Sequence, residues 1–132
     1  MKKIILLSIM AIMSMTALAQ RTTYKINYSY EYDQQKNDYI KKLDYCDGTV
    51  TRTSKDIVIR GISYNIVSED MNTSNAERRS VQYTCKDVRG QEYIICFNEE
   101  LTFPEWLHYQ VLIFNANSPY DWTYYITDAG QQ

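Results

Sequence analysis

The amino-acid sequence predicts a small, all-β, antiparallel domain that follows a secretory signal peptide. Three observations support this prediction. Apolar and polar side chains alternate along several short segments, turn-forming residues separate those segments, and an uncharged apolar run follows two lysines at the N-terminus. The thirteen tyrosines agree with it, because tyrosine favours the half-buried surface of a pleated sheet.

Residues 1–19 have the three parts of a bacterial-type secretory signal. Lys2 and Lys3 form a basic region, residues 4–18 carry no charge, and Ala17-Leu18-Ala19 is an A-x-A cleavage site. The apolar run is shorter than the roughly 18 to 20 residues that cross a bilayer. We therefore expect cleavage after Ala19, a periplasmic or extracellular location, and no membrane insertion afterwards. The residue directly after the cleavage site is Gln20 and not cysteine, so a lipoprotein is not expected.

Residues 20–132 then form one domain, since about 113 residues suit a single core and no linker divides them. Loss of Lys2 and Lys3 leaves 12 basic against 16 acidic residues, a formal charge of −4. Nucleic acid requires a basic surface that neutralises phosphates. The charge therefore argues against a nucleic-acid partner.

The first strand is predicted between Lys25 and Tyr32. Its apolar residues occupy every second position: Ile26, Tyr28, Tyr30 and Tyr32. Strict alternation places such a set on one face of a strand. We expect these four side chains to face the core together.

Three hairpins are predicted further along the chain. A two-residue turn at Arg60-Gly61 pairs Ile59 with Ile62, because glycine tolerates the positive φ of tight turns. A loop that ends on Gly90 pairs Tyr83 with Ile95. The third hairpin joins residues 110–114 to residues 122–127.

Two segments have less regular patterns. Residues 38–45 fit either a short helix or a strand, and the polar residues 68–79 have the composition of a mobile loop. The whole chain predicts an antiparallel meander of seven or eight strands, with at most one short helix. Such a meander either closes into a barrel or folds into a two-sheet sandwich, since both limit exposed edges.

The three cysteines of the mature chain allow one disulfide at most. The predicted hairpin register puts Cys85 and Cys96 on opposite faces and three positions apart, which a disulfide does not bridge. A bridge would therefore join Cys46 to Cys85 or to Cys96. Three unpaired, buried thiols are the alternative.

No catalytic, metal or cofactor site is predicted. His108 is the single histidine, and neither a G-x-S-x-G nor an S-x-x-K motif occurs. Glu105 and His108 have helical i, i+3 spacing, but a lone histidine among aromatic residues is more often a packed side chain. We therefore expect a protein that is not an enzyme.

Aromatic side chains are the remaining functional signal, because the chain holds more rings than one sheet face can bury. The candidate binding residues are Trp106, Tyr109, Trp122, Tyr124 and Tyr125. Alternation places Trp122 and Tyr124 on one face of their strand and Tyr125 on the other. Exposed tyrosine and tryptophan suit protein interfaces and stack on sugars. The first expected function is therefore a secreted or periplasmic module that binds a protein or glycan through an aromatic face or strand edge.

The second expected function is a small-molecule carrier with its ligand inside a barrel. In that case the interior would be lined by tyrosines, namely Tyr28, Tyr30, Tyr64, Tyr83 and Tyr93. A hollow interior favours the carrier, and a filled interior favours the module. The sequence does not identify the partner or the oligomeric state.

Overall fold

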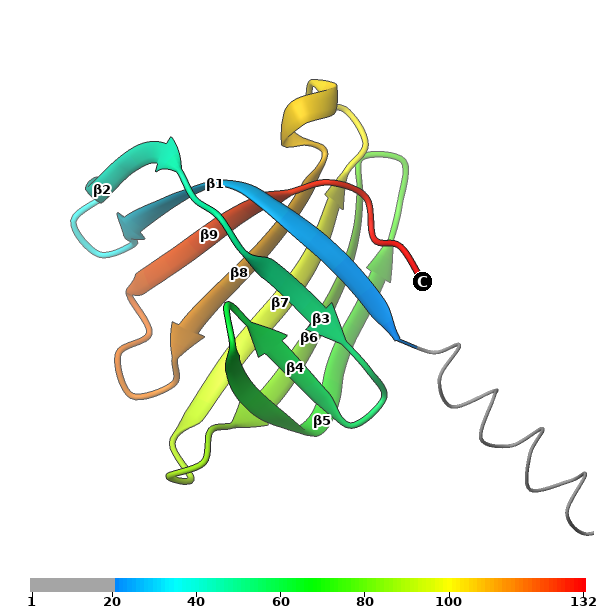
Figure 1. Cartoon of the computed structure of the whole chain (residues 1–132). Helices are drawn as coiled ribbons and strands as arrows, with labels where there is room; N and C mark the ends of the chain where they lie inside the picture. The colour runs from blue at the N-terminus through cyan, green and yellow to red at the C-terminus, as the bar shows by residue number, and fades with distance from the viewer. Residues whose placement is uncertain (1–20) are drawn as a thin grey trace, which may run out of the picture.

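The computed structural model describes residues 21–132, which form nine strands and one short 3-10 helix (Figure 1). The elements in chain order are β1 (Thr22–Asp33), β2 (Asp38–Tyr45), β3 (Thr49–Arg52), β4 (Asp56–Ile59), β5 (Ile62–Ser74), β6 (Arg78–Lys86), β7 (Glu92–Glu100), η1 (Glu105–Leu107), β8 (Tyr109–Asn115) and β9 (Asp121–Thr127). All strand pairings are antiparallel. The predicted all-β class is confirmed. The expected signal peptide, residues 1–19, lies outside the described residues.

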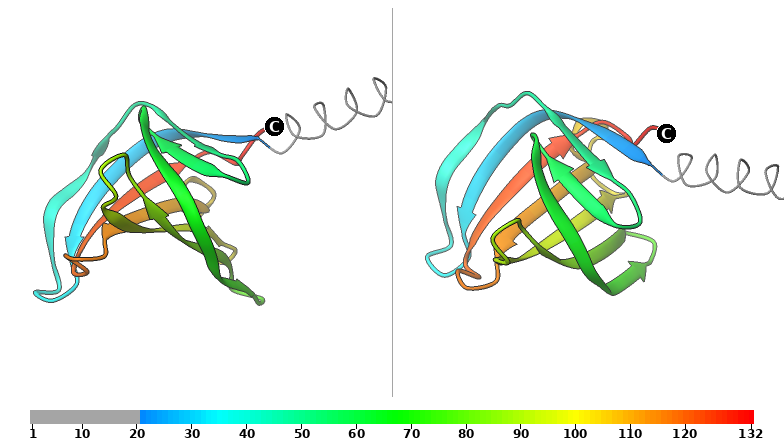
Figure 2. Two further views of the ribbon diagram at one scale, coloured as in Figure 1. Left: turned by 90° about the horizontal axis from the view of Figure 1, so that it is seen from below. Right: turned by 60° about the horizontal axis from the view of Figure 1, so that its bottom comes forward.

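Eight strands close into a barrel, which decides between the barrel and the sandwich. The order around the barrel is β1-β3-β4-β5-β6-β7-β8-β9, and β9 pairs back with β1. The remaining strand, β2, lies outside this order. The first half of β1 pairs with β3, and the second half pairs with β2. Figure 2 shows the short β3–β4 hairpin between β1 and β5. No helix among residues 21–132 is long and apolar enough to span a bilayer.

The predicted hairpin registers are confirmed. Ile59 pairs with Ile62 across a turn in which Arg60 and Gly61 have φ of 49° and 83°. Tyr83 pairs with Ile95. In both cases the turn and the alternation are local properties of the chain, so neighbouring residues are enough to set the register.

The third hairpin also forms, whereas residues 68–79 are not the loop that was expected. These residues are mostly strand, since β5 continues to Ser74 and β6 begins at Arg78. Two bulges interrupt the β5–β6 ladder, between Ile66 and Ser68 and between Glu69 and Met71. Each bulge adds a residue and shifts the alternation, which is why the sequence pattern of this strand was not recognisable.

The expected single apolar face of the first strand is wrong. Ile26 pairs with Thr127 and Tyr28 pairs with Ile126, so Asn27 is the extra residue of a bulge. Ile26 therefore belongs to the core, and Tyr28 and the two alternate tyrosines after it face outward. The bulge reverses the inside and outside positions halfway along β1.

Apolar side chains fill the middle of the barrel. Ile26, Val50, Ile57 and Ile95 are almost completely buried, and they belong to one continuous core cluster. Eight strands leave an interior just wide enough for side chains to fill. Open space is therefore confined to the ends.

The cysteines are free thiols in the structure. Cys85 belongs to the barrel core. Cys96 alternates with the core residues Ile95 and Phe97 along β7, so it faces outward, and it pairs with Gln82 of β6. The expected offset of three positions between them is present. The bridge from Cys46 to Cys85 or Cys96 is not formed, and the alternative of unpaired thiols describes the structure.

Candidate functional site

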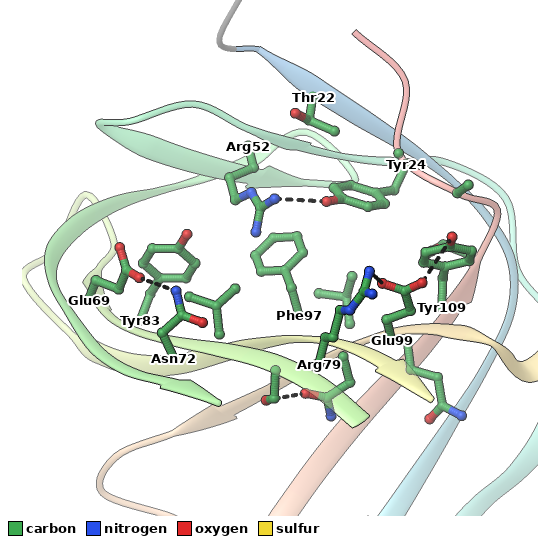
Figure 3. A pocket seen from close by; sticks show the side chains of 18 of the residues that line it. Thr22, Tyr24, Arg52, Glu69, Asn72, Arg79, Tyr83, Phe97, Glu99 and Tyr109 are labelled. Atoms are coloured by element: carbon green, nitrogen blue, oxygen red, sulfur yellow. Dashed lines mark hydrogen bonds and ion pairs between the residues drawn. The ribbon is translucent and has the colours of Figure 1, made fainter. Parts of the chain in front are cut away.

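A pocket of about 790 Å³ lies at one end of the barrel (Figure 3). Seven of the eight barrel strands contribute to it, and the C-terminal segment adds Ala129 and Gly130. The pocket lies where β1 begins and where β3, β5, β7 and β9 end. Its volume is within the roughly 300 to 1,000 Å³ typical of ligand sites.

Three aromatic rings and one arginine form the floor of the pocket. Tyr24 and Phe97 are buried, with ring centroids 5.4 Å apart, and Tyr83 lies 6.0 Å from Phe97 on the other side. The Arg52 guanidinium carbon lies 4.4 Å from the Phe97 centroid. Arg52 Nη2 donates a 3.0 Å hydrogen bond to the Tyr24 hydroxyl. The floor therefore combines an apolar surface with one cation.

Polar side chains surround this floor. Arg79 Nη1 lies 3.6 Å from Glu99 Oε2, and the Tyr109 hydroxyl donates to Glu99 Oε1 at 3.5 Å. Asn72 Nδ2 donates to Glu69 Oε1 at 3.4 Å. Arg79 is thus neutralised by Glu99, and the polar groups of the pocket lie above an aromatic base.

The tyrosine hydroxyls of the floor stay protonated at neutral pH. Burial raises the pKa of Tyr24 above its usual value of 10, and the nearby Arg52 charge partly offsets this. Burial likewise raises the pKa of Tyr83, with Arg52 again opposing the effect. Both hydroxyls are therefore available as neutral hydrogen-bond donors or acceptors.

The β5 bulges help to build the pocket. Glu69 pairs with Tyr83 and Asn72 pairs with Val81, both of which point into the barrel. Inward side chains thus recur every third residue rather than every second. The β5 segment after Asn65 pairs only with β6, so one wall of the pocket has an unpaired edge.

The C-terminal segment closes part of the pocket rim. The amide of Thr23 donates to the carbonyl of Gln131, and the amide of Gln131 donates back. A Cβ on Gly130 would lie 2.7 Å from the Tyr24 ring. Only glycine lets the backbone approach the ring so closely, and this contact holds the segment against the floor.

The opposite end of the barrel has a smaller hollow of about 230 Å³. Tyr64, Tyr93 and Tyr125 contribute to it, together with Glu31. The Tyr64 and Tyr93 rings meet edge to face, with centroids 5.1 Å apart. Because these rings occupy most of the barrel end, this hollow is the weaker candidate for a ligand.

Stacked rings cross the outer face of β8, β9, β1 and β2. Phe114 stacks on Trp122 at 5.0 Å, and Tyr124 stacks on Tyr30 at 4.5 Å with an interplanar angle of 7°. Tyr39 of β2 extends the row, 5.9 Å from Tyr30. We call these five residues the aromatic ladder. Leu112 and Ile126 lie on the same outer face and are buried.

The five binding residues expected from the sequence do not form one surface. Trp122 and Tyr124 belong to the aromatic ladder, and Trp106 in η1 packs against Tyr28, also on the outer face. Tyr109 lines the larger pocket, and Tyr125 lines the smaller one at the opposite end. The predicted separation of Tyr124 from Tyr125 onto opposite faces is correct.

The tyrosines expected to line the barrel are also divided. Tyr64, Tyr83 and Tyr93 face the interior. Tyr28 and Tyr30 lie on the outer face because of the Asn27 bulge. The interior therefore holds only part of the predicted set.

Five polar residues of the pocket were not predicted from the sequence: Arg52, Glu69, Asn72, Arg79 and Glu99. Glu99 could have been predicted to face the interior, because it follows Phe97 by two positions on a strand whose register was predicted. Arg52 was harder to predict, because β3 has only four residues and shows no clear alternation of apolar and polar residues.

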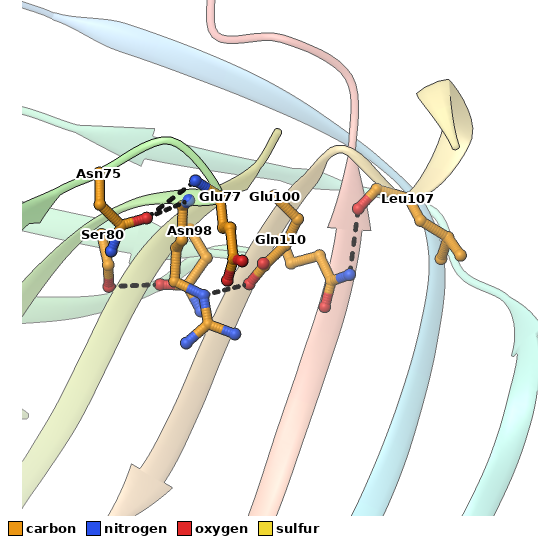
Figure 4. Close-up of polar contacts among 8 residues, drawn as sticks. Asn75, Glu77, Ser80, Asn98, Glu100, Leu107 and Gln110 are labelled. Atoms are coloured by element: carbon orange, nitrogen blue, oxygen red, sulfur yellow. Dashed lines mark hydrogen bonds and ion pairs between the residues drawn. The ribbon is translucent and has the colours of Figure 1, made fainter. Parts of the chain in front are cut away.

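A polar network occupies outward positions of β6, β7 and β8 beside the larger pocket, whose lining residues include Ser80, Asn98 and Gln110 (Figure 4). The Ser80 hydroxyl donates to Asn98 Oδ1 at 2.6 Å, and Gln110 Nε2 donates to the Leu107 carbonyl at 3.0 Å. Arg78 Nε lies 2.7 Å from Glu100 Oε1, whose side chain is buried. These contacts satisfy the polar atoms that the loop after β7 covers.

No group of three or more His, Cys, Asp or Glu side chains within residues 21–132 is arranged to hold a metal ion. Comparison with protein-family models, curated proteins and solved structures found no match to this chain. What the larger pocket and the aromatic ladder can bind therefore follows from their own chemistry.

Proposed function

We propose that the protein is a periplasmic or extracellular binding protein that holds a small organic molecule in the larger end pocket. This is the second of the two functions expected from the sequence. The observation that supports it most is a concave site of about 790 Å³ whose aromatic floor carries a few polar groups. Ligand sites are commonly apolar with a small number of orienting polar groups, and they occur at the mouths of β-barrels.

The chemistry of the lining favours binding over catalysis. Neither histidine nor cysteine lines the pocket, so it offers no familiar nucleophile and base pair. Arg79 and Glu99 already contact each other. We therefore propose that the protein is not an enzyme and that it releases its ligand unchanged.

A pocket-filling variant tests this proposal. Val81 lines the pocket and is partly buried, whereas Val88 lies in the β6–β7 loop at the other end of the barrel and is exposed. Titration with the neutral dye N-phenyl-1-naphthylamine should give saturable binding. We expect V81F to weaken it at least tenfold and V88F to leave it unchanged.

The two tryptophans supply an internal control for the location of the dye. Trp106 and Trp122 are the only tryptophans of the chain, and neither lines the larger pocket. In NMR spectra, pocket binding should shift the backbone amides of Arg52 and Phe97 and leave both indole N–H signals in place. Absence of saturable binding, or equal binding by V81F, would contradict the proposed pocket.

Binding of a protein or glycan through the outer face is the second candidate function. Trp106 is half exposed beside Tyr28, and the outer edge of β2 has no partner strand among the described residues. Titration with soluble oligosaccharides should then shift the indole N–H signals and not the pocket amides. Unchanged indole signals would count against this candidate for glycans.

A further inference from the structure

Arg52 is a partly buried charged group of the pocket, and no oppositely charged side chain forms an ion pair with it. The ion pairs within residues 21–132 are Arg78 with Glu100 and Arg79 with Glu99. Arg52 takes part in neither. Arg52 donates a hydrogen bond to the Tyr24 hydroxyl and also contacts the Tyr83 hydroxyl, which leaves further donors unused because a guanidinium has five N–H groups.

The net charge of the pocket does not by itself select a ligand, because two arginines and two glutamates line it. Their environments differ. Glu99 is occupied by Arg79, and Glu69 is exposed to solvent, where water compensates its charge. Arg52 lies against Phe97 at 4.4 Å and 5.7 Å from the Tyr24 ring. Rings on these sides displace water, so a bound anion would gain most at Arg52.

Arginine is also the side chain best suited to an acidic group. Its planar fork binds the two oxygens of a carboxylate, or of a phosphate, through parallel hydrogen bonds. The Tyr24 hydroxyl and the Phe97 ring hold the Arg52 fork in place, which reduces the entropy lost on binding. In the view of Figure 3, Arg52 points toward Tyr24 and lies over the Phe97 ring.

The remaining lining defines the rest of the ligand. Phe97, Tyr83, Val81 and Val111 present apolar surface in the same pocket as Arg52, and aromatic rings favour flat apolar groups through offset or edge contacts. We propose that the ligand is an organic anion whose carboxylate or phosphate group binds Arg52 and whose apolar body lies on Phe97 and Tyr83. This inference rests on the proposed pocket function and names its ligand class.

Matched probes test the inference on the unmodified protein. 1-Naphthoate, 1-naphthyl phosphate and the neutral 1-naphthalenemethanol share a ring system and differ in the acidic group. By calorimetric titration we expect at least one of the two anions to bind about tenfold or more tightly than the alcohol, because hydrogen bonds to a charged group are stronger than those between neutral groups. The tighter of the two anions indicates which acidic group the site prefers.

Variants assign the effect to Arg52. R52M keeps an unbranched aliphatic side chain at this position and removes the guanidinium that lies over Phe97, while R89M removes an exposed arginine from the loop at the other barrel end. R52M should lose about tenfold in affinity for the preferred anion and change little for the alcohol. R52K, which restores the charge without the fork, should recover part of the loss. R89M should match the unmodified protein.

The outcomes separate this inference from the proposed function. If the anions and the alcohol bind the pocket equally, or R52M binds the anions as tightly as the unmodified protein, the anion inference is overturned and the pocket function stands. If none of the probes shifts the pocket amides at millimolar concentration, both are overturned. Probe comparison on the unmodified protein keeps the test valid should R52M not fold.

Discussion

The ion pair between Arg78 and Glu100 provides the sharpest test of the packing outside the barrel. The two residues are opposite each other on β6 and β7, and Arg78 Nε lies 2.7 Å from Glu100 Oε1. The Glu100 side chain is 7% exposed and the Arg78 side chain 53%. The next pair along the strands, Arg79 and Glu99, is 3.6 Å apart and more exposed at both ends. Two cross-strand pairs of the same chemistry thus differ mainly in burial.

Replacing Arg78 by methionine should lower the free energy of unfolding by about 2 kcal/mol. Loss of one partner from a fully buried pair costs about 3–5 kcal/mol, and an exposed pair contributes about 0–1 kcal/mol. Water can reach the Arg78 side of this pair, so an intermediate value applies. R79M should cost less than about 1 kcal/mol. Because methionine keeps the aliphatic stem, both variants change charge more than packing.

Urea and thermal denaturation at neutral pH measure the difference. A change of about 2 kcal/mol corresponds to a shift in Tm of roughly 6–12 °C for a domain of this size. Adding E100Q to R78M removes the unpaired buried charge and should recover part of the loss. Equal destabilisation by R78M and R79M, or no recovery in the double variant, would refute the argument that burial of Glu100 sets the magnitude.

Two further predictions concern buried groups that titrate. Burial raises the pKa of Tyr64 to about 12, whereas the unfolded chain titrates near about 10, so the folded state keeps a proton that the unfolded state loses. The free energy of unfolding should fall as pH rises from about 10 to about 12, and Y64F should show a shallower decline; an identical decline would be evidence against this. Burial also raises the pKa of Cys85 to about 12 and of Cys96 to about 11, so in the native protein iodoacetamide should alkylate Cys46 first. Mass spectrometry of tryptic peptides reports the order, and equally fast alkylation of Cys85 would contradict its burial.

Local features of the fold could be predicted because they depend on neighbouring residues. Arg60 and Gly61 form a tight turn in which both residues have positive φ, and the alternation on either side then determines that Ile59 faces Ile62. The same reasoning placed Tyr83 opposite Ile95. Alternation also separated Tyr124 from Tyr125 correctly, since β9 contains no bulge between them.

Bulges mark the limit of this reasoning. The alternation from Ile26 to Tyr32 is unbroken in sequence, yet the extra residue at Asn27 reverses which face is inside. A bulge arises where two strands of different curvature must stay paired around a barrel, so it depends on β9 as much as on β1. In β5, two bulges and a polar composition together concealed a strand of 13 residues.

The sequence by itself determined the all-β class and the hairpin registers, because turn chemistry and period-two alternation act within a few residues. The abundance of aromatic rings is a property of the composition alone. Only the tertiary structure decided that the sheet closes into a barrel, that its middle is filled and that one end is hollow. The hollow depends on residues that lie far apart in the chain, and Arg52 meets Phe97 only because β3 and β7 face each other across the barrel. Packing volume and strand closure are properties of the whole domain, and no short stretch of sequence contains them.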